Sequence, residues 1–181
     1  HPHSLLIYTA PFVGIGWLLL GLHPLPAQPE QTPVISGLSL VTALFKGIGQ
    51  VMLLQHPAAG LLIVLGLWLS HWRAAVWALV GSLAGLMFSL YLHDTSTALS
   101  GLAGYNPALA ALALSQQRRG VWLPLSGIVL TLLLMPVFKA LGMPPLTAPF
   151  VLGCWLIASG VRLFSPEPVA DDAQSRLRIE R

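Results

Sequence analysis

Two threonines combine a residue type and a spacing suited to holding a small polar solute. Thr9 and Thr147 stand in nearly identical strings, YTAPFVGIGW at residues 8–17 and LTAPFVLGCW at residues 146–155, related by a shift of 138 residues. A hydroxyl donates and accepts hydrogen bonds, and the proline two residues later interrupts helical hydrogen bonding. Interrupted helices in corresponding positions of two repeats indicate a transport site at the repeat interface. We therefore predict that the two hydroxyls meet and offer oxygens to a solute.

The composition is that of a membrane protein. Hydrophobic residues make up 55% of the chain and charged residues 8%, with a mean hydropathy of +0.77, whereas soluble proteins carry roughly 25% charged residues. Stretches without Asp, Glu, Lys or Arg cover residues 74–93, 95–117, 120–138 and 140–161. Each is close to the ~20 residues that a helix needs to cross a bilayer. We expect an all-α polytopic protein embedded in a lipid bilayer, because continuous apolar runs favour helices over alternating barrel strands.

Proline-rich and polar segments divide the chain. The expected parts are the last helix of a first repeat at 1–21, an extramembrane linker at 22–35, a second repeat at 36–164 and a polar cytoplasmic tail at 165–181. Lys46 and Gln50 would be costly against lipid, so the segment that holds them is predicted to be re-entrant or to line a water-filled cavity. Within the second repeat we expect this segment at about 38–56 and spans at about 57–70, 74–92, 97–115, 120–138 and 146–164.

The distribution of charge predicts the orientation. All seven arginines fall on one side of this topology, and only Lys139 lies in a loop on the other side. By the positive-inside rule the arginine-rich side is the cytoplasm, so we expect a multi-pass protein with a cytoplasmic C-terminus.

Three separated motifs point to one family. They are FKGIGQVMLLQHPAAGLLIVLGL at 45–67, GLAGYNPALAALAL at 101–114 and PPLTAPFVLGCWL at 144–156. In this order and at this spacing they resemble the urea transporter family, with residues 36–164 as a second half and residues 5–20 as the last helix of a first half. The resemblance implies two inverted halves, each with five spanning helices and a tilted, re-entrant, half-length pore helix, which in this chain is the segment at about 38–56. It also implies one urea pore per subunit, a homotrimer, and a place in the cell (inner) membrane.

Urea is flat and neutral and has four N–H donors, so its crossing cost is mainly desolvation of polar groups. A pore can lower that cost with an apolar slot against the flat faces and a row of oxygens along one edge. The resemblance assigns solute contacts to Gln50, Val51, Leu53, Tyr105, Leu109, Thr9 and Thr147. Tyr105 and Leu109 are one helical turn apart and so share a face.

Three positions depart from the family pattern and bear on selectivity. Leu53 stands where the family usually has an aromatic slot wall, and Tyr105 stands where Phe is commoner. His56, in LQHP, replaces an expected amide. Structural interpretations also remain open, since the threonines can bond to carbonyls freed by the prolines and Tyr105 can serve packing alone.

The absent residue patterns restrict the function. Every acidic residue lies in an expected loop or tail, whereas proton- or sodium-coupled carriers keep carboxylates within their spans. Passive, channel-like urea conduction is therefore expected. We expect no enzyme, cofactor or metal site and no nucleic-acid partner, because no nucleophile–base pair, phosphate loop or metal-ligand spacing occurs in the expected spans. The alternatives are a channel for ammonia, water or short amides, and a non-transporting membrane subunit.

The repeat also bears on completeness. One whole repeat and the end of another cannot enclose a pore made of two halves. The chain begins at His1 and not at Met. We therefore expect that an N-terminal half is missing and that this half completes the pore.

Overall fold

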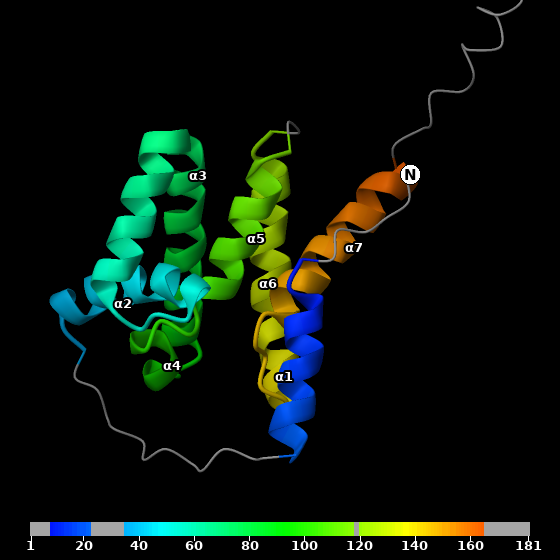
Figure 1. The fold of residues 1–181 in the computed structure, drawn as a ribbon, viewed down its shortest axis with the longest axis horizontal. Coiled ribbons are helices and arrows are strands. Elements are labelled where there is room, and N and C mark those ends of the chain that lie inside the picture. The colour runs from blue at the N-terminus through cyan, green and yellow to red at the C-terminus, as the bar shows by residue number, and fades with distance from the viewer. Residues whose placement is uncertain (1–7, 23–34, 118–119, 165–181) are drawn as a thin grey trace, which may run out of the picture.

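The computed structural model describes residues 8–22, 35–117 and 120–164. Every regular element in these ranges is a helix (Figure 1), which confirms the all-α class for the described part of the chain. The elements are α1 (Ala10–Leu22), α2 (Gly37–Gly49), the 3₁₀ turn η1 (Gln50–Met52), α3 (Pro57–Tyr91), α4 (Thr95–Leu99), α5 (Tyr105–Ser115), α6 (Trp122–Ala140) and α7 (Ala148–Phe164). By length and apolar composition, the ranges of α3 and α6 each contain a stretch that can cross a membrane.

The element α3 consists of two antiparallel helices. His71 has φ −149° and ψ 91°, outside the helical region, and the chain reverses direction there (Figure 1). The two arms correspond to the spans expected at 57–70 and 74–92. The first arm begins at Pro57, and the Nδ1 atom of His56 accepts a hydrogen bond from the N–H of Ala58 at 3.3 Å. His56, the unexpected residue of the LQHP string, is therefore the N-cap of α3.

The span expected at 97–115 is corrected by the structure. It is divided into α4 and α5, which the loop at residues 100–104 separates. Gly101 in this loop has φ +84°, and a Cβ added there would lie 2.7 Å from the backbone nitrogen of Gly47 in α2. The break thus follows from close packing of the loop on the end of α2. With 11 residues, α5 is only about 16 Å long.

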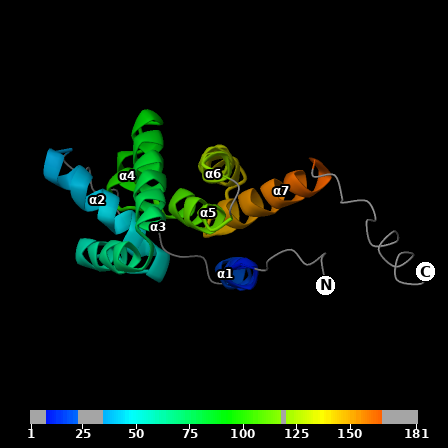
Figure 2. The same cartoon turned by 90° about the horizontal axis from the view of Figure 1, so that it is seen from above.

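The helices form two groups that α5 joins. On one side α2 lies across the lower end of the α3 arms, next to α4; on the other side α1, α6 and α7 pack together (Figures 1 and 2). One hydrophobic core joins α5 to α7 through Ala110, Leu114, Phe150, Val151 and Cys154. A second core joins α1, α6 and α7 through Val13, Phe138 and Ala148.

The outer faces of the helices are apolar. Leu69 is 88% exposed, Leu62 68% and Leu18 64%. Large apolar side chains exposed in this way on several helices are typical of surfaces that lipid or a neighbouring membrane helix covers.

Candidate functional site

The two repeated strings adopt the same local structure. Tyr8 and Leu146 have φ values of 46° and 43°, in the left-handed region that residues other than glycine adopt uncommonly. Thr9 and Thr147 follow directly, and the helices α1 and α7 each begin at the next residue. The sequence repeat is therefore also a repeat of backbone conformation over these residues.

This arrangement corrects the expected role of the prolines. Pro11 and Pro149 lie at the second position of α1 and α7, in the first turn, where an N–H has no acceptor within the helix. The prolines therefore begin these helices and do not interrupt them. The expected start of α7 at 146 moves to Ala148; of the helix expected at about 5–21, residues 5–7 lie outside the described residues.

The threonine hydroxyls contact each other. The Oγ1 atoms of Thr9 and Thr147 are 2.7 Å apart, a hydrogen-bond distance, and both side chains are half-buried. The helices α1 and α7 leave this point in divergent directions (Figure 1), so two helix N-termini converge on the hydroxyl pair. Each hydroxyl has one proton and two lone pairs, so the mutual bond leaves one proton and three lone pairs for a solute. The positive ends of two helix dipoles add an environment suited to a carbonyl oxygen.

Tyr105 and Leu109 lie next to this pair on α5. The hydroxyl of Tyr105 donates a hydrogen bond to the carbonyl of Leu146, the residue before Thr147. Leu109 packs against the core that joins α5 to α7. The structure therefore brings four of the seven predicted contact residues to one region of the fold.

The other three predicted residues lie at the turn η1: Gln50 and Val51 belong to it, and Leu53 follows its last residue. Gln50 is buried, and its Nε2 atom donates to the carbonyl of Ser100 at 3.4 Å, which ties the end of α2 to the end of α4. Val51 is half-buried. Leu53 has φ +58° and is 72% exposed. Within the described residues it therefore does not form part of a slot wall. η1 also contacts α5, the helix that carries Tyr105.

Asn106 is a residue that sequence reasoning did not select. It is fully buried, and its Nδ2 atom donates to the same Leu146 carbonyl at 2.8 Å. Its Oδ1 atom has no hydrogen-bond partner among the described residues. The available signal was the GYNPAL string itself, because a polar amide within an apolar membrane segment is expensive and commonly functional.

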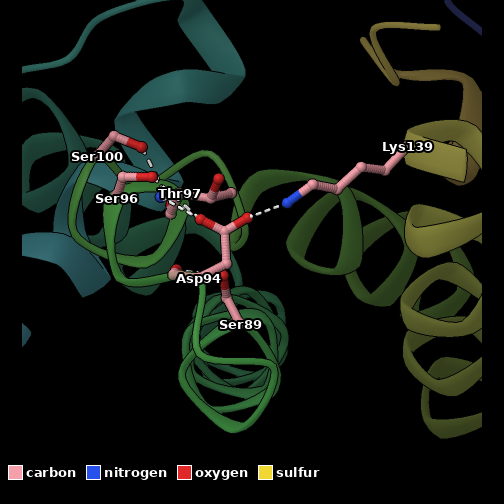
Figure 3. A network of polar contacts seen from close by, with 6 residues as sticks. All are labelled: Ser89, Asp94, Ser96, Thr97, Ser100 and Lys139. Carbon is pink, nitrogen blue, oxygen red and sulfur yellow. Dashed lines mark hydrogen bonds and ion pairs between the residues drawn. The ribbon is translucent and has the colours of Figure 1, made fainter. Parts of the chain in front are cut away.

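Asp94 forms a second polar network, at the corner between α3 and α4 (Figure 3). Its Oδ1 atom accepts hydrogen bonds from the N–H of Thr97 and the hydroxyl of Ser96, both at 3.1 Å, and its Oδ2 atom contacts Lys139 Nζ at 2.7 Å. Burial raises the pKa of Asp94, but the bonds from Lys139, Thr97 and Ser96 outweigh it and lower the pKa from 3.8 to about 2. The network joins the α3–α4 corner to the end of α6.

The lowered pKa predicts an acid-dependent loss of stability. Because the folded state holds the Asp94 carboxylate more tightly than the unfolded state, its contribution is complete above about pH 3.8 and is lost as the pH falls towards 2. We expect Asp94→Asn to lower the free energy of unfolding by about 0.5 kcal/mol at neutral pH, since Lys139 is 75% exposed and such pairs are weak. Unfolding in detergent as a function of pH tests this. A wild-type-to-variant difference that stays constant down to pH 2 contradicts it.

Within the described residues, no group of three or more His, Cys, Asp or Glu side chains could hold a metal ion. Lys46 is half-buried in the last turn of α2, where a cation interacts favourably with the helix dipole.

The family model for the urea transporter matches residues 1–161. The chain belongs to the urea transporter family. It is 27% identical over 144 residues to urea transporter 1 of Ovis aries and 30% identical over 148 residues to urea transporter 1 of Mus musculus. These matches cover 71% and 72% of this chain and 37% of each relative. The chain therefore spans little more than a third of the length of these relatives. The match confirms the family predicted from the three motifs.

Proposed function

We propose that this urea transporter family chain forms part of a passive, channel-like pathway that carries urea across the membrane. The observation that supports this most directly is the hydroxyl pair of Thr9 and Thr147, 2.7 Å apart where two helix N-termini converge. A solute with four N–H donors and one carbonyl meets acceptor lone pairs, a free hydroxyl proton and two helix dipoles at this point. These groups replace the hydrogen bonds that the solute makes with water, and they add no charge that would bind the solute too tightly.

The slot that faces the flat sides of urea is proposed to include Tyr105, Leu109 and Val51. Tyr105 and Leu109 are neighbours on α5, beside the threonine pair, and Val51 lies in the turn η1 that contacts α5. Gln50 lies beside Val51 and is proposed to offer its amide oxygen to the solute, because the hydrogen bond to Ser100 uses only its nitrogen. Leu53, exposed in the described residues, is proposed to meet the solute in the assembled pore.

Passive conduction is supported by the positions of the acidic residues. Asp94 is the single acidic residue in the described ranges; it lies at the α3–α4 corner and its carboxylate is engaged by Lys139. A proton- or sodium-coupled carrier needs an ionisable group along the path. The proposed path offers hydroxyls, amides and apolar side chains only.

The proposed assembly is a homotrimer in the inner membrane, in which a second, inverted half completes each pore. The repeated string at α1 and α7 and the large exposed apolar faces support this arrangement. The turn of α3 and the end of α7 lie at one end of the molecule and the end of α6 at the other (Figure 1). With the arginine asymmetry, this arrangement supports a cytoplasmic C-terminus.

The proposal is tested by solute flux in proteoliposomes that contain the protein in its native assembly. We expect urea to equilibrate faster than acetamide, and water to cross far more slowly than through an aquaporin-like pore. Urea flux is expected to be independent of proton and sodium gradients. If urea flux were the same in proteoliposomes and in protein-free liposomes, the chain would be a non-transporting subunit. Faster flux of ammonia or water than of urea would show a channel for another small neutral solute.

A further inference from the structure

We propose that Tyr105 and Asn106 are positioning residues for Thr147, and that the Tyr105 hydroxyl also sets solute specificity by occupying an acceptor next to the threonine pair. The inference rests on the proposed urea pathway and adds to it the groups that shape its middle.

Two donors converge on one carbonyl. The Tyr105 hydroxyl and the Asn106 Nδ2 atom, adjacent at the start of α5, both donate to the carbonyl oxygen of Leu146, the second at 2.8 Å. A carbonyl oxygen has two lone pairs. Both are used, so this oxygen cannot accept from a solute while both side chains hold it.

The orientation of the Asn106 amide follows from the same contact. If the amide were flipped, Oδ1 would face the Leu146 carbonyl, and two acceptors would oppose each other. In the observed orientation Oδ1 is buried without a hydrogen-bond partner among the described residues. An unsatisfied buried oxygen is costly, which indicates that the donor contact to Leu146 determines how this side chain is placed.

The carbonyl contact controls the direction of Thr147. Leu146 has the uncommon φ of 43°, and its carbonyl belongs to the same rigid peptide plane as the N–H of Thr147. When two donors fix that plane, they fix the start of α7 and the direction in which the Thr147 side chain leaves it. The hydroxyl then reaches Thr9 at 2.7 Å.

The Tyr105 hydroxyl affects specificity as well as position. Phenylalanine at this place keeps the ring and frees one lone pair of the Leu146 carbonyl, one residue from the threonine pair. That oxygen extends the row of acceptors. Urea, with four N–H donors, gains more from an added acceptor than acetamide, which has two.

The test is a comparison of Tyr105→Phe with Tyr91→Phe in proteoliposomes. Tyr91 is 78% exposed and lies outside the pathway, so it controls for loss of a tyrosine hydroxyl. We expect Tyr105→Phe to raise the urea-to-acetamide permeability ratio about threefold, in the range of one modest hydrogen bond, and Tyr91→Phe to leave the ratio unchanged. An unchanged ratio in Tyr105→Phe overturns the specificity role.

The positioning role is tested with Asn106→Leu in two backgrounds. We expect this change to lower urea flux about tenfold in the wild-type background and about twofold at most in Thr147→Val, because the amide acts through the Thr147 hydroxyl. An equal loss in both backgrounds overturns the proposal. If Asn106→Leu does not accumulate in the membrane, Asn106→Ala, which also removes the donor to the Leu146 carbonyl, is compared in the same two backgrounds. Absence of protein-dependent urea flux in the wild type overturns the proposed function itself, and this inference with it.

Discussion

Replacement of Thr147 by valine is expected to lower urea permeability about tenfold, while the protein still folds and inserts. Valine has the same shape as threonine but no hydroxyl, so the change removes one oxygen from the proposed path and leaves the Thr9 hydroxyl without its partner at 2.7 Å. Loss of such a bond for a half-buried group costs about 1–3 kcal/mol, and 1.4 kcal/mol corresponds to a factor of ten. Flux is measured in proteoliposomes at matched protein density.

The control for this change is Thr147→Ser, which keeps the hydroxyl and removes only a methyl group. We expect it to retain most of the urea flux. The double variant Thr9→Val/Thr147→Val should lower flux by less than the product of the two single effects, because the residues act as a pair. Urea flux that is unaffected by Thr147→Val would mean that the hydroxyl pair is structural only.

Replacement of Gly101 by alanine is expected to be among the most destabilising single changes in the described part of the chain. The added Cβ would lie 2.7 Å from the Gly47 nitrogen and 2.8 Å from the Lys46 carbonyl carbon, and φ is +84°. The left-handed backbone costs roughly 1–2 kcal/mol with a side chain present, and overpacking against backbone adds about 1–3 kcal/mol. We expect a total loss of about 3 kcal/mol in the free energy of unfolding, measured in detergent.

Gly120→Ala separates the two causes. Gly120 has a similar φ of +79°, but the added Cβ would have no atom of the described residues within 4 Å apart from Gly120 and its chain neighbours. We expect this variant to lose about 1 kcal/mol, from backbone conformation alone. Equal losses in the two variants would show that the contact between the 100–104 loop and α2 contributes nothing. A specific loss in Gly101→Ala should also lower urea flux, since this contact lies between the segments that carry Gln50 and Tyr105.

Several features of the candidate site were predictable because they repeat or are local. The strings around Thr9 and Thr147 share proline, phenylalanine and tryptophan in register, and similar strings adopt similar backbones, here with Tyr8 and Leu146 both at positive φ. The repeat therefore predicted two equivalent local structures, although it was interpreted as a pair of helix interruptions and the structure shows a pair of helix starts. Whether the expected contact residues bind urea stays a prediction until flux is measured.

The apolar runs by themselves determined an all-helical membrane protein, because hydropathy and helix-forming patterns are properties of neighbouring residues. The three motifs, by their resemblance to the urea transporter family, determined the family. Tertiary structure alone decided that residues 97–115 break at Gly101, that Asn106 holds the Leu146 carbonyl, and that Lys139 bonds to Asp94. The last two contacts join residues 40 and 45 positions apart. They depend on how the helices approach each other. Side-chain packing determines that approach, and no local pattern of residues records it.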